Sequence, residues 1–173
     1  TLTTPSWNSR EKPEDDDTLT PAESRAPSLR TRSTDVEHLS HSHHPTSKIG
    51  ILLVDDHAMV RQGLRSVLEH YDDVAVVGEA STGREAIEFV ERLRPAVIVM
   101  DINMPETNGI DATVEIKARH PDVAVIGLSV HNTAEARKAM LQAGATTLLS
   151  KESAVDELYA AIRQALADEG VPR

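Results

Sequence analysis

The chain has 173 residues, a formal net charge of −10 at pH 7, four aromatic residues and no cysteine. This length predicts one domain, or one domain with a tail, and the lack of cysteine excludes disulfides and zinc–thiolate sites. The acidic balance argues against electrostatic capture of nucleic acid or of an anionic membrane surface. No apolar stretch approaches the roughly 20 residues of a membrane span, and no signal peptide opens the chain. We therefore expect a cytoplasmic protein whose present segment binds neither membrane nor nucleic acid directly.

Residues 1–47 differ in composition from the rest of the chain. They contain 16 Ser or Thr residues, five of the nine prolines and no glycine, and their apolar residues are isolated. Such a segment cannot bury enough apolar surface to offset the entropy lost on ordering, so we expect a disordered linker. Its histidines offer metal ligands, but their spacing is neither helical nor that of a zinc finger, which favours a solvated linker. These histidines are His38, His41, His43 and His44.

From Lys48 onward the pattern changes to alternating strands and helices. The apolar run Ile49–Val54 is typical of a strand buried on both faces, and apolar residues at helical spacing follow over residues 59–68. Residues 74–77 predict a second strand. Ser81 or Thr82 is expected to cap a helix that ends before Pro95.

The second half of this region repeats the alternation. The apolar run 96–100 predicts a third strand, followed by a short helix over 111–119 and a fourth strand over 123–128. A helix over 133–142, with Gly144 as its C-terminal stop, leads to a fifth strand over 147–149 and a last helix over 155–166. Five strands alternating with five helices predict an α/β fold with a parallel sheet covered on both faces and right-handed crossovers.

Polar residues follow the predicted strands where each one ends. Asp55 and Asp56 follow the first strand, Asp101 the third and Ser129 the fourth, and the fifth strand leads into Lys151. Taken singly, each has an ordinary explanation as a turn residue, a helix cap or a solvated side chain. In an open α/β sheet, however, ligands bind outside the carboxyl ends of the strands. Five such residues at one edge therefore predict a functional site.

This residue set is suited to metal-assisted phosphoryl transfer to a carboxylate. Three neighbouring carboxylates repel one another, and a hard divalent cation such as Mg²⁺ relieves that repulsion. One carboxylate can then attack phosphorus as a nucleophile. The cation, a lysine and a hydroxyl would share the charge on the transferring phosphoryl group.

The same residues carry a resemblance to a known family. The segments Val54-Asp55-Asp56-His57, Asp101-Ile-Asn-Met-Pro105 with Gly109, Leu128-Ser129 and Lys151 resemble the receiver domain of bacterial two-component response regulators. The resemblance covers residues 48–168 and leaves 169–173 as a C-terminal tail. It implies a flavodoxin-like, doubly wound, five-stranded parallel sheet in the order 2-1-3-4-5 with five helices, as in the chemotaxis receiver. His57 and the overall sequence are most similar to receivers that precede helix-turn-helix DNA-binding domains.

The resemblance also implies a role for each site residue. Asp101 corresponds to the phosphoacceptor, Ser129 to the hydroxyl that bonds the phosphoryl group, and Lys151 to the lysine that pairs with it. Asp56 corresponds to the direct Mg²⁺ ligand and Asp55 to an assisting ligand that acts partly through water. The other implied metal ligands are Asp101 and the backbone carbonyl of Asn103.

Some positions near this site vary within the family or depart from its usual pattern. Asn103 and His131 occupy variable positions that tune the rates of phosphorylation and hydrolysis. Leu148 stands where many receivers carry an aromatic residue that swings inward on activation, so an aromatic-based switch is not expected here. Glu152 replaces a proline that is often cis, and a cis bond is disfavoured for any other residue.

The resemblance implies a phosphorelay function in which a histidine kinase or phosphotransfer domain donates to Asp101. Such a receiver promotes its own phosphorylation and dephosphorylation but is not a turnover enzyme. Modification is expected to switch the surface formed by the fourth helix, fifth strand and fifth helix, which is also a candidate dimer surface. We expect the parent protein to be a hybrid sensor histidine kinase, because a polar linker precedes the domain and no effector follows it. The alternatives are a DNA-binding transcription regulator cut before its effector and a stand-alone receiver.

Overall fold

The computed structural model describes residues 48–168, so the expected linker 1–47, its histidines and the expected tail 169–173 lie outside the described residues. Helices and strands alternate throughout this part, as the apolar pattern predicts. The elements are β1 (Ile49–Val54), α1 (Ala58–Leu68), β2 (Val74–Ala80), α2 (Gly83–Leu93), β3 (Val97–Asp101), α3 (Gly109–Arg119), β4 (Ala124–Ser129), α4 (Ala134–Gln142), β5 (Thr147–Ser150) and α5 (Ala154–Asp168).

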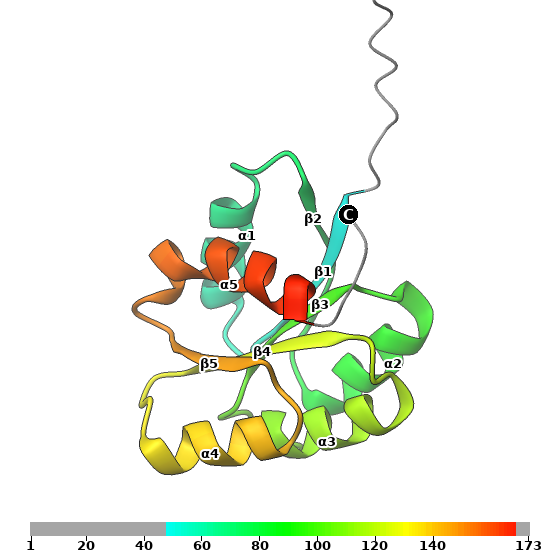
Figure 1. Ribbon diagram of the computed structural model, residues 1–173, viewed down its shortest axis with the longest axis vertical. Helices are drawn as coiled ribbons and strands as arrows, with labels where there is room; N and C mark the ends of the chain where they lie inside the picture. The colour runs from blue at the N-terminus through cyan, green and yellow to red at the C-terminus, as the bar shows by residue number, and fades with distance from the viewer. Residues whose placement is uncertain (1–47, 169–173) are drawn as a thin grey trace, which may run out of the picture. The chain divides into compact units, whose positions relative to one another are not determined.

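The five strands form one parallel sheet in the order β2-β1-β3-β4-β5 (Figure 1). This confirms the expected flavodoxin-like topology. In the register of the sheet, Asp101 lies opposite Leu128 and Ser129 lies opposite Ser150. The polar residues that end β1, β3, β4 and β5 are therefore brought to one edge of the sheet, because parallel strands share the direction of their carboxyl ends.

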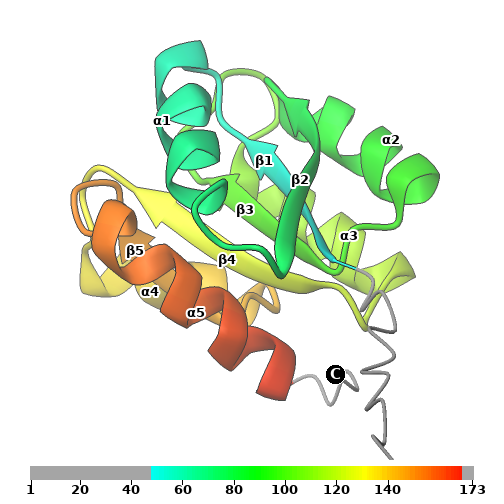
Figure 2. The same ribbon diagram turned by 90° about the horizontal axis from the view of Figure 1, so that it is seen from above.

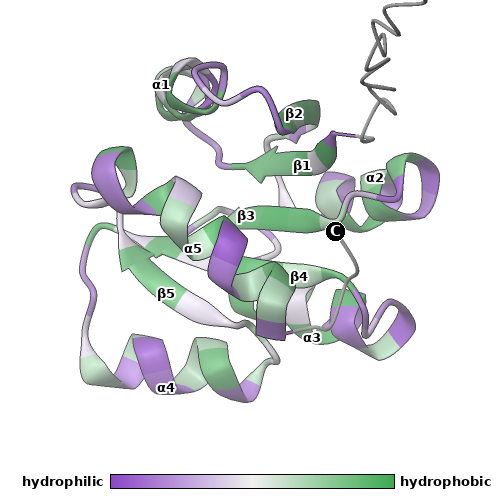
Figure 3. Cartoon of the chain, turned by 45° about the horizontal axis from the view of Figure 1, so that its top comes forward, coloured by the Kyte–Doolittle hydropathy of each residue, from purple (hydrophilic) through white to green (hydrophobic). Residues whose placement is uncertain are grey.

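Helices cover both faces of the sheet, with α1 and α5 on one face and α2, α3 and α4 on the other (Figure 2). Successive side chains of a strand point to opposite faces. In β1, accordingly, Leu52 and Val54 pack under α2 and α3, whereas Ile51 and Leu53 pack under α1 and α5. The strands are apolar and the polar residues gather on the helices (Figure 3). Among residues 48–168, no helix is long and apolar enough to cross a membrane.

Most elements differ from their predicted bounds by one to three residues, and for two of them the reason is local packing. β2 continues past Val77 to Ala80. Val77 forms a β-bulge, because Ile51 of β1 pairs with Val76 and Leu52 pairs with Gly78, which leaves Val77 without a partner in β1. A Cβ on Gly78 would lie 2.5 Å from Leu93 Cδ1, so this glycine lets the strand pass close beneath α2. α3 begins at Gly109, two residues earlier than predicted, because Asn108 caps it by accepting a hydrogen bond from the Asp111 amide.

Capping side chains define where the other helices begin and end. Thr82 caps α2 and Thr133 caps α4, each accepting an amide hydrogen bond from three residues further on. Gly144 follows Ala143, the C-cap of α4, at φ = 100°, and its amide donates to the carbonyl of Leu141. The next amide bonds the carbonyl of Met140, which completes a Schellman motif. The predicted cap and the predicted glycine stop are both observed.

Two aromatic residues of the domain pack α5 against the loop before β2. The rings of Tyr71 and Tyr159 stack with their centroids 3.6 Å apart. The Tyr159 hydroxyl and the Arg163 guanidinium both donate to the Asp73 carboxylate. Burial and the Asp73 carboxylate together raise the pKa of Tyr159. This cluster lies beside the amino end of β2, which starts at Val74, whereas the polar edge is at the strands' carboxyl ends.

Candidate functional site

Lys151 joins two buried carboxylates at the carboxyl edge of the sheet. Its Nζ lies 2.6 Å from Asp55 Oδ2 and 2.8 Å from Asp101 Oδ2. Asp55 and Asp101 expose 0% and 1% of their surface, and the lysine side chain exposes 14%. Buried charges are tolerated only when they are paired. The structure thus places three of the predicted site residues in direct contact.

The second oxygen of each buried carboxylate is held by a backbone amide. Asp55 Oδ1 accepts from the His57 amide at 2.9 Å, and Asp101 Oδ1 accepts from the Asn103 amide at 3.1 Å. Arg61 of α1 donates to the backbone carbonyl of Asp55 at 2.6 Å. The two amide bonds orient the carboxylates, and the Arg61 bond ties the backbone of Asp55 to α1.

The electrostatics of Lys151 follow from this pairing. Burial by itself lowers the pKa of the ammonium, but hydrogen bonds to Asp101 and Asp55 and the charges of both outweigh it. The net effect raises the pKa of Lys151 above its ordinary value. The lysine is therefore a permanent positive charge at the site throughout the physiological range.

Asp56 and His57 form the outer part of the same cluster. Asp56 exposes 27% of its side chain and His57 66%, and His57 Nδ1 lies 2.8 Å from Asp56 Oδ1 and 3.3 Å from Asp55 Oδ1. One potential ligand atom from each of Asp55, Asp56, His57 and Asp101 lies within 4.8 Å of all the others. Asp55 Oδ2 is paired with the Lys151 ammonium, and Asp56 Oδ1 is buried with His57 Nδ1 as its close neighbour. A cluster of three carboxylates that contains only one lysine fits a hard divalent cation.

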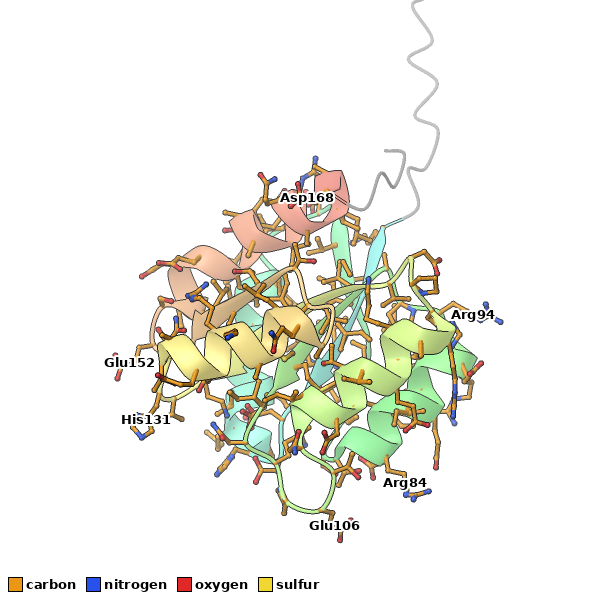
Figure 4. All side chains as sticks on the ribbon, turned by 60° about the horizontal axis from the view of Figure 1, so that its bottom comes forward. Arg84, Arg94, Glu106, His131, Glu152 and Asp168 are labelled. Atoms are coloured by element: carbon orange, nitrogen blue, oxygen red, sulfur yellow. The ribbon has the colours of Figure 1, made fainter. Side chains whose placement is uncertain are left out.

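Ser129 lies at the site edge with its hydroxyl turned toward the following loop. Its Oγ donates to the His131 carbonyl at 2.9 Å and accepts from the His131 amide at 3.1 Å. The Ser129 carbonyl accepts from the Lys151 amide at 2.8 Å, which links the ends of β4 and β5. The side chains of His131 and Glu152 project outward on one side of the domain (Figure 4). Ser129 is thus adjacent to the charged cluster but engaged with its own loop.

Leu148 is buried in the core on the α4 side of the sheet. A Cβ on Gly127 would lie 2.7 Å from Leu148 Cδ1 and 2.9 Å from Met140 Cγ, so the leucine packs closely over β4. Arg137 of α4 donates to the Leu148 carbonyl at 2.9 Å. Position 148 therefore carries an inward-packed aliphatic side chain and ties α4 to β5 through its backbone.

The loop between β3 and α3 folds back closely against the backbone of Asp101. A Cβ on Gly109 would overlap the Asp101 carbonyl oxygen, so only glycine allows this approach. Glu106, at the exposed tip of the loop (Figure 4), has φ = 66°, a left-handed conformation. The loop thereby keeps Asn103 in position to bond the Asp101 carboxylate.

Comparison with known families agrees with this geometry. The family model described as "Response regulator receiver domain" matches residues 51–163, which include every site residue described above. The chain belongs to this family.

Curated relatives of this receiver are response regulators from several bacteria. The response regulator UvrY of Escherichia coli K12 is 42% identical over 115 residues, which are 66% of this chain and 53% of UvrY. The transcriptional regulatory protein DegU of Brevibacillus brevis is 39% identical over 117 residues, which are 68% of this chain and 50% of DegU. The chain thus spans about half the length of these relatives.

Solved receiver structures share the fold. The response regulator domain of Thermotoga maritima CheB is 34% identical, with a TM-score of 0.65, over 69% of this chain and 97% of that one. The signal receiver domain of the putative response regulator NarL from Mycobacterium tuberculosis is 28% identical, with a TM-score of 0.67, over 70% of this chain and 98% of that one. Each solved domain is covered almost completely by residues of this receiver.

Two residues of the receiver site were not predicted as site residues from the sequence. His57 was interpreted only as a mark of the subfamily, although it directly follows the acidic pair. Arg61 lies one helical turn further on and contacts the Asp55 backbone. Its guanidinium also binds Glu79, which is shared with Arg65. The position of His57 directly after the acidic pair is a signal from which its place in the site could be predicted. The contact of Arg61 with Asp55 depends instead on the direction of α1, which the sequence does not give.

Proposed function

We propose that Asp101 of this receiver accepts a phosphoryl group from the phosphohistidine of a histidine kinase or phosphotransfer domain. The observation that carries the proposal is the pairing of the buried Asp101 carboxylate with Lys151 at the carboxyl edge of the sheet. One carboxylate oxygen is oriented by the Asn103 amide and the other faces a permanent cation. A nucleophile held in this way loses little entropy on reaction.

The transfer forms one oxygen–phosphorus bond and breaks one nitrogen–phosphorus bond. A carboxylate oxygen of Asp101 attacks phosphorus, and the donor imidazole leaves with the bonding electron pair. Lys151 lies within ion-pair distance of Asp101, so its ammonium can stabilise the negative charge on the phosphoryl oxygens during transfer. The cation site would be formed by Asp55, Asp56, Asp101 and the Asn103 carbonyl. A bound Mg²⁺ would neutralise charge on the phosphoryl group.

We further propose that phosphorylation is read through Ser129 and α4. The Ser129 hydroxyl is bonded only within its own loop among the described residues, so reaching a phosphoryl oxygen requires it to release the His131 backbone. That movement would reposition the start of α4, which is tied to β5 by the Arg137–Leu148 hydrogen bond. Because Leu148 is already packed inward, the α4–β5–α5 surface would change without an aromatic swing.

The relatives favour the DNA-binding regulator over the hybrid kinase expected from the linker. DegU is named a transcriptional regulatory protein, UvrY is named a response regulator, and this receiver spans about half of each. We therefore infer that the parent is a transcription regulator whose effector domain follows the receiver. Sequencing the gene on both sides of this segment tests this. A helix-turn-helix segment would support it, and an ATP-binding kinase domain upstream of the receiver would contradict it.

The phosphoacceptor is tested by replacing Asp101. The chain is incubated with Mg²⁺ and a small phosphodonor such as acetyl phosphate, and its intact mass is measured. We expect the unaltered chain to gain one phosphoryl group that is lost in mild alkali, and Asp101→Asn to gain none. The matched control is Asp122→Asn, an exposed carboxylate in the turn before β4. It should be phosphorylated like the unaltered chain, and equal phosphorylation of Asp101→Asn would disprove the assignment.

A further inference from the structure

His57 belongs to the cluster formed with Asp55, Asp56 and Asp101, and its imidazole caps no helix. It occupies the N-cap position of α1, but its side chain makes no capping hydrogen bond. Its backbone is already held, because the amide donates to Asp55 Oδ1 and the carbonyl accepts from Val60 and Arg61. Although 66% of the side chain is exposed, the imidazole turns toward the carboxylates.

The spacing of the imidazole and the carboxylates matches neighbouring ligands of one ion. Two ligands bound about 2.1 Å from an octahedral cation and at right angles to each other lie about 3.0 Å apart. His57 Nδ1 lies 2.8 Å from Asp56 Oδ1 and 3.3 Å from Asp55 Oδ1. Asp56 Oδ1 is buried, and this imidazole nitrogen is its close neighbour. A potential nitrogen ligand and a potential oxygen ligand thus stand side by side.

The Lys151 ammonium does not occupy the side of the cluster that His57 faces. Its ammonium contacts the Oδ2 atoms of Asp55 and Asp101. His57 instead faces the Oδ1 atoms of Asp55 and Asp56. An ion near Asp56 would therefore meet the imidazole without first displacing the lysine from Asp101.

We propose that His57 Nδ1 is a ligand of the divalent cation in this receiver. Carboxylate, carbonyl and water ligands suit Mg²⁺ and Mn²⁺, whereas imidazole suits ions later in the first transition row, such as Ni²⁺. The imidazole should therefore increase the preference of the site for Co²⁺ or Ni²⁺ over Mg²⁺. The proposal rests on the cation site of the proposed function and adds to it the identity of a fourth side-chain ligand.

A hydrogen bond from Nδ1–H to Asp56 would produce a similar distance, so the test must separate the two roles. His57→Asn places an amide near the position of Nδ1 and preserves a donor, but it removes the imidazole nitrogen. His57→Ala removes both. His131→Ala is the matched control, because this histidine is exposed beside the site and its bonds to Ser129 are made by its backbone. All chains compared, the parent included, carry Gln in place of His38, His41, His43 and His44, so that the N-terminal histidines bind no metal.

Two measurements on the full chain decide the question. Calorimetric titration should show Co²⁺ binding weakened about tenfold or more in both His57→Ala and His57→Asn. Mg²⁺ affinity should stay within about twofold in these variants, because Mg²⁺ prefers oxygen ligands. Pulsed electron paramagnetic resonance of bound Mn²⁺ should show coupling to imidazole nitrogen in the parent and in His131→Ala, but not in the His57 variants.

The opposite results have distinct meanings. Unchanged Co²⁺ affinity in His57→Ala, or a Mn²⁺ spectrum without nitrogen coupling in the parent, would overturn the role of His57 while leaving the phosphoacceptor intact. A His57→Asn variant that retains the parent's Co²⁺ affinity would show that the imidazole nitrogen is not required and would also overturn it. Failure of the proposed function is read separately, from phosphorylation of Asp101→Asn.

Discussion

Lys151 is the residue on which the buried charge of the site depends. It is paired with both Asp55 and Asp101, and each carboxylate is almost fully buried. Removing one partner of a buried ion pair leaves an uncompensated charge, which costs more than the pair itself contributes. The lysine is thus important for stability as well as for the proposed transfer.

Lys151→Met is expected to lower the free energy of unfolding at pH 7 by about 3 kcal/mol. The difference should shrink at alkaline pH. A group with a raised folded pKa contributes stability that is present below its unfolded pKa, roughly 10.4 for lysine, and lost as pH rises through the folded pKa. Urea unfolding followed by circular dichroism between pH 7 and 11.5 measures both effects.

The control for this prediction is Lys138→Met, an exposed lysine of α4. Its stability should follow that of the unaltered chain at every pH. Tyr159, whose pKa is also raised, contributes the same alkaline loss to all three chains, so the difference between them isolates Lys151. A difference for Lys151→Met that does not diminish above the ordinary lysine pKa would contradict the ion-pair interpretation.

The identities of the site residues could be predicted from the sequence, but their partners could not. The adjacent strands β3, β4 and β5 end at or just before Asp101, Ser129 and Lys151. The register of the parallel sheet brings these strand ends together. The direction of each side chain depends instead on loop conformation. The Ser129 hydroxyl turns to His131, and Lys151 bridges to Asp55 as well as Asp101. No spacing rule encodes either contact.

At the scale of single elements, two glycines have opposite effects on helix stability. Gly63 lies inside α1, and a Cβ there would meet no atom within 4 Å. Gly144 ends α4 at φ = 100°, where a Cβ would also lie 3.0 Å from Lys117 Cγ. The first glycine only lowers helix propensity, whereas the second allows a backbone conformation that other residues rarely adopt.

Gly63→Ala should raise the free energy of unfolding by about 0.5–1 kcal/mol, because alanine loses less backbone entropy in a helix. Gly144→Ala should lower it by about 1–2 kcal/mol, because alanine is strained in the left-handed region. Thermal and urea unfolding of the two variants and the unaltered chain measure these changes. Each variant is the other's control, and the same sign of change in both would contradict the explanation.

The helices and strands themselves were largely predictable from periodicity and capping residues. The errors occur where tertiary packing extends an element beyond its sequence signal. β2 continues through Gly78 because the glycine passes under Leu93, and α3 starts early because Asn108 caps it. Glycine and asparagine commonly mark turns, so their role inside or beside an element depends on contacts from elsewhere in the chain.

For the domain as a whole, alternation of strands and helices predicts a parallel sheet but not its strand order. Several orders satisfy right-handed crossovers, and the order 2-1-3-4-5 was implied by the family resemblance. The observed sheet confirms it. This order matters physically because β1 and β3 are neighbours, which brings Asp55 and Asp56 beside Asp101. Three carboxylates against one lysine leave an excess of negative charge at this edge.

Because this excess charge is built into the fold, a divalent cation should stabilise the whole domain. A ligand that binds only the folded state adds RT ln(1 + [L]/Kd), which is about 1.4 kcal/mol at a concentration of ten times Kd. For a domain of this size the unfolding midpoint should rise by roughly 5 °C. Scanning calorimetry of the unaltered chain over a series of Mg²⁺ concentrations measures the shift, with ionic strength held constant to exclude screening.

Asp56→Asn separates this linkage from general electrostatics. Without Mg²⁺ the variant should match or exceed the unaltered chain in stability, because one of three mutually repelling carboxylates is gone. With Mg²⁺ its midpoint should hardly move, since Asp56 supplies a carboxylate oxygen to the proposed cation site. A Mg²⁺-induced shift of equal size in Asp56→Asn would mean that the cation acts elsewhere on the acidic domain, and the carboxylate edge would then not be its site.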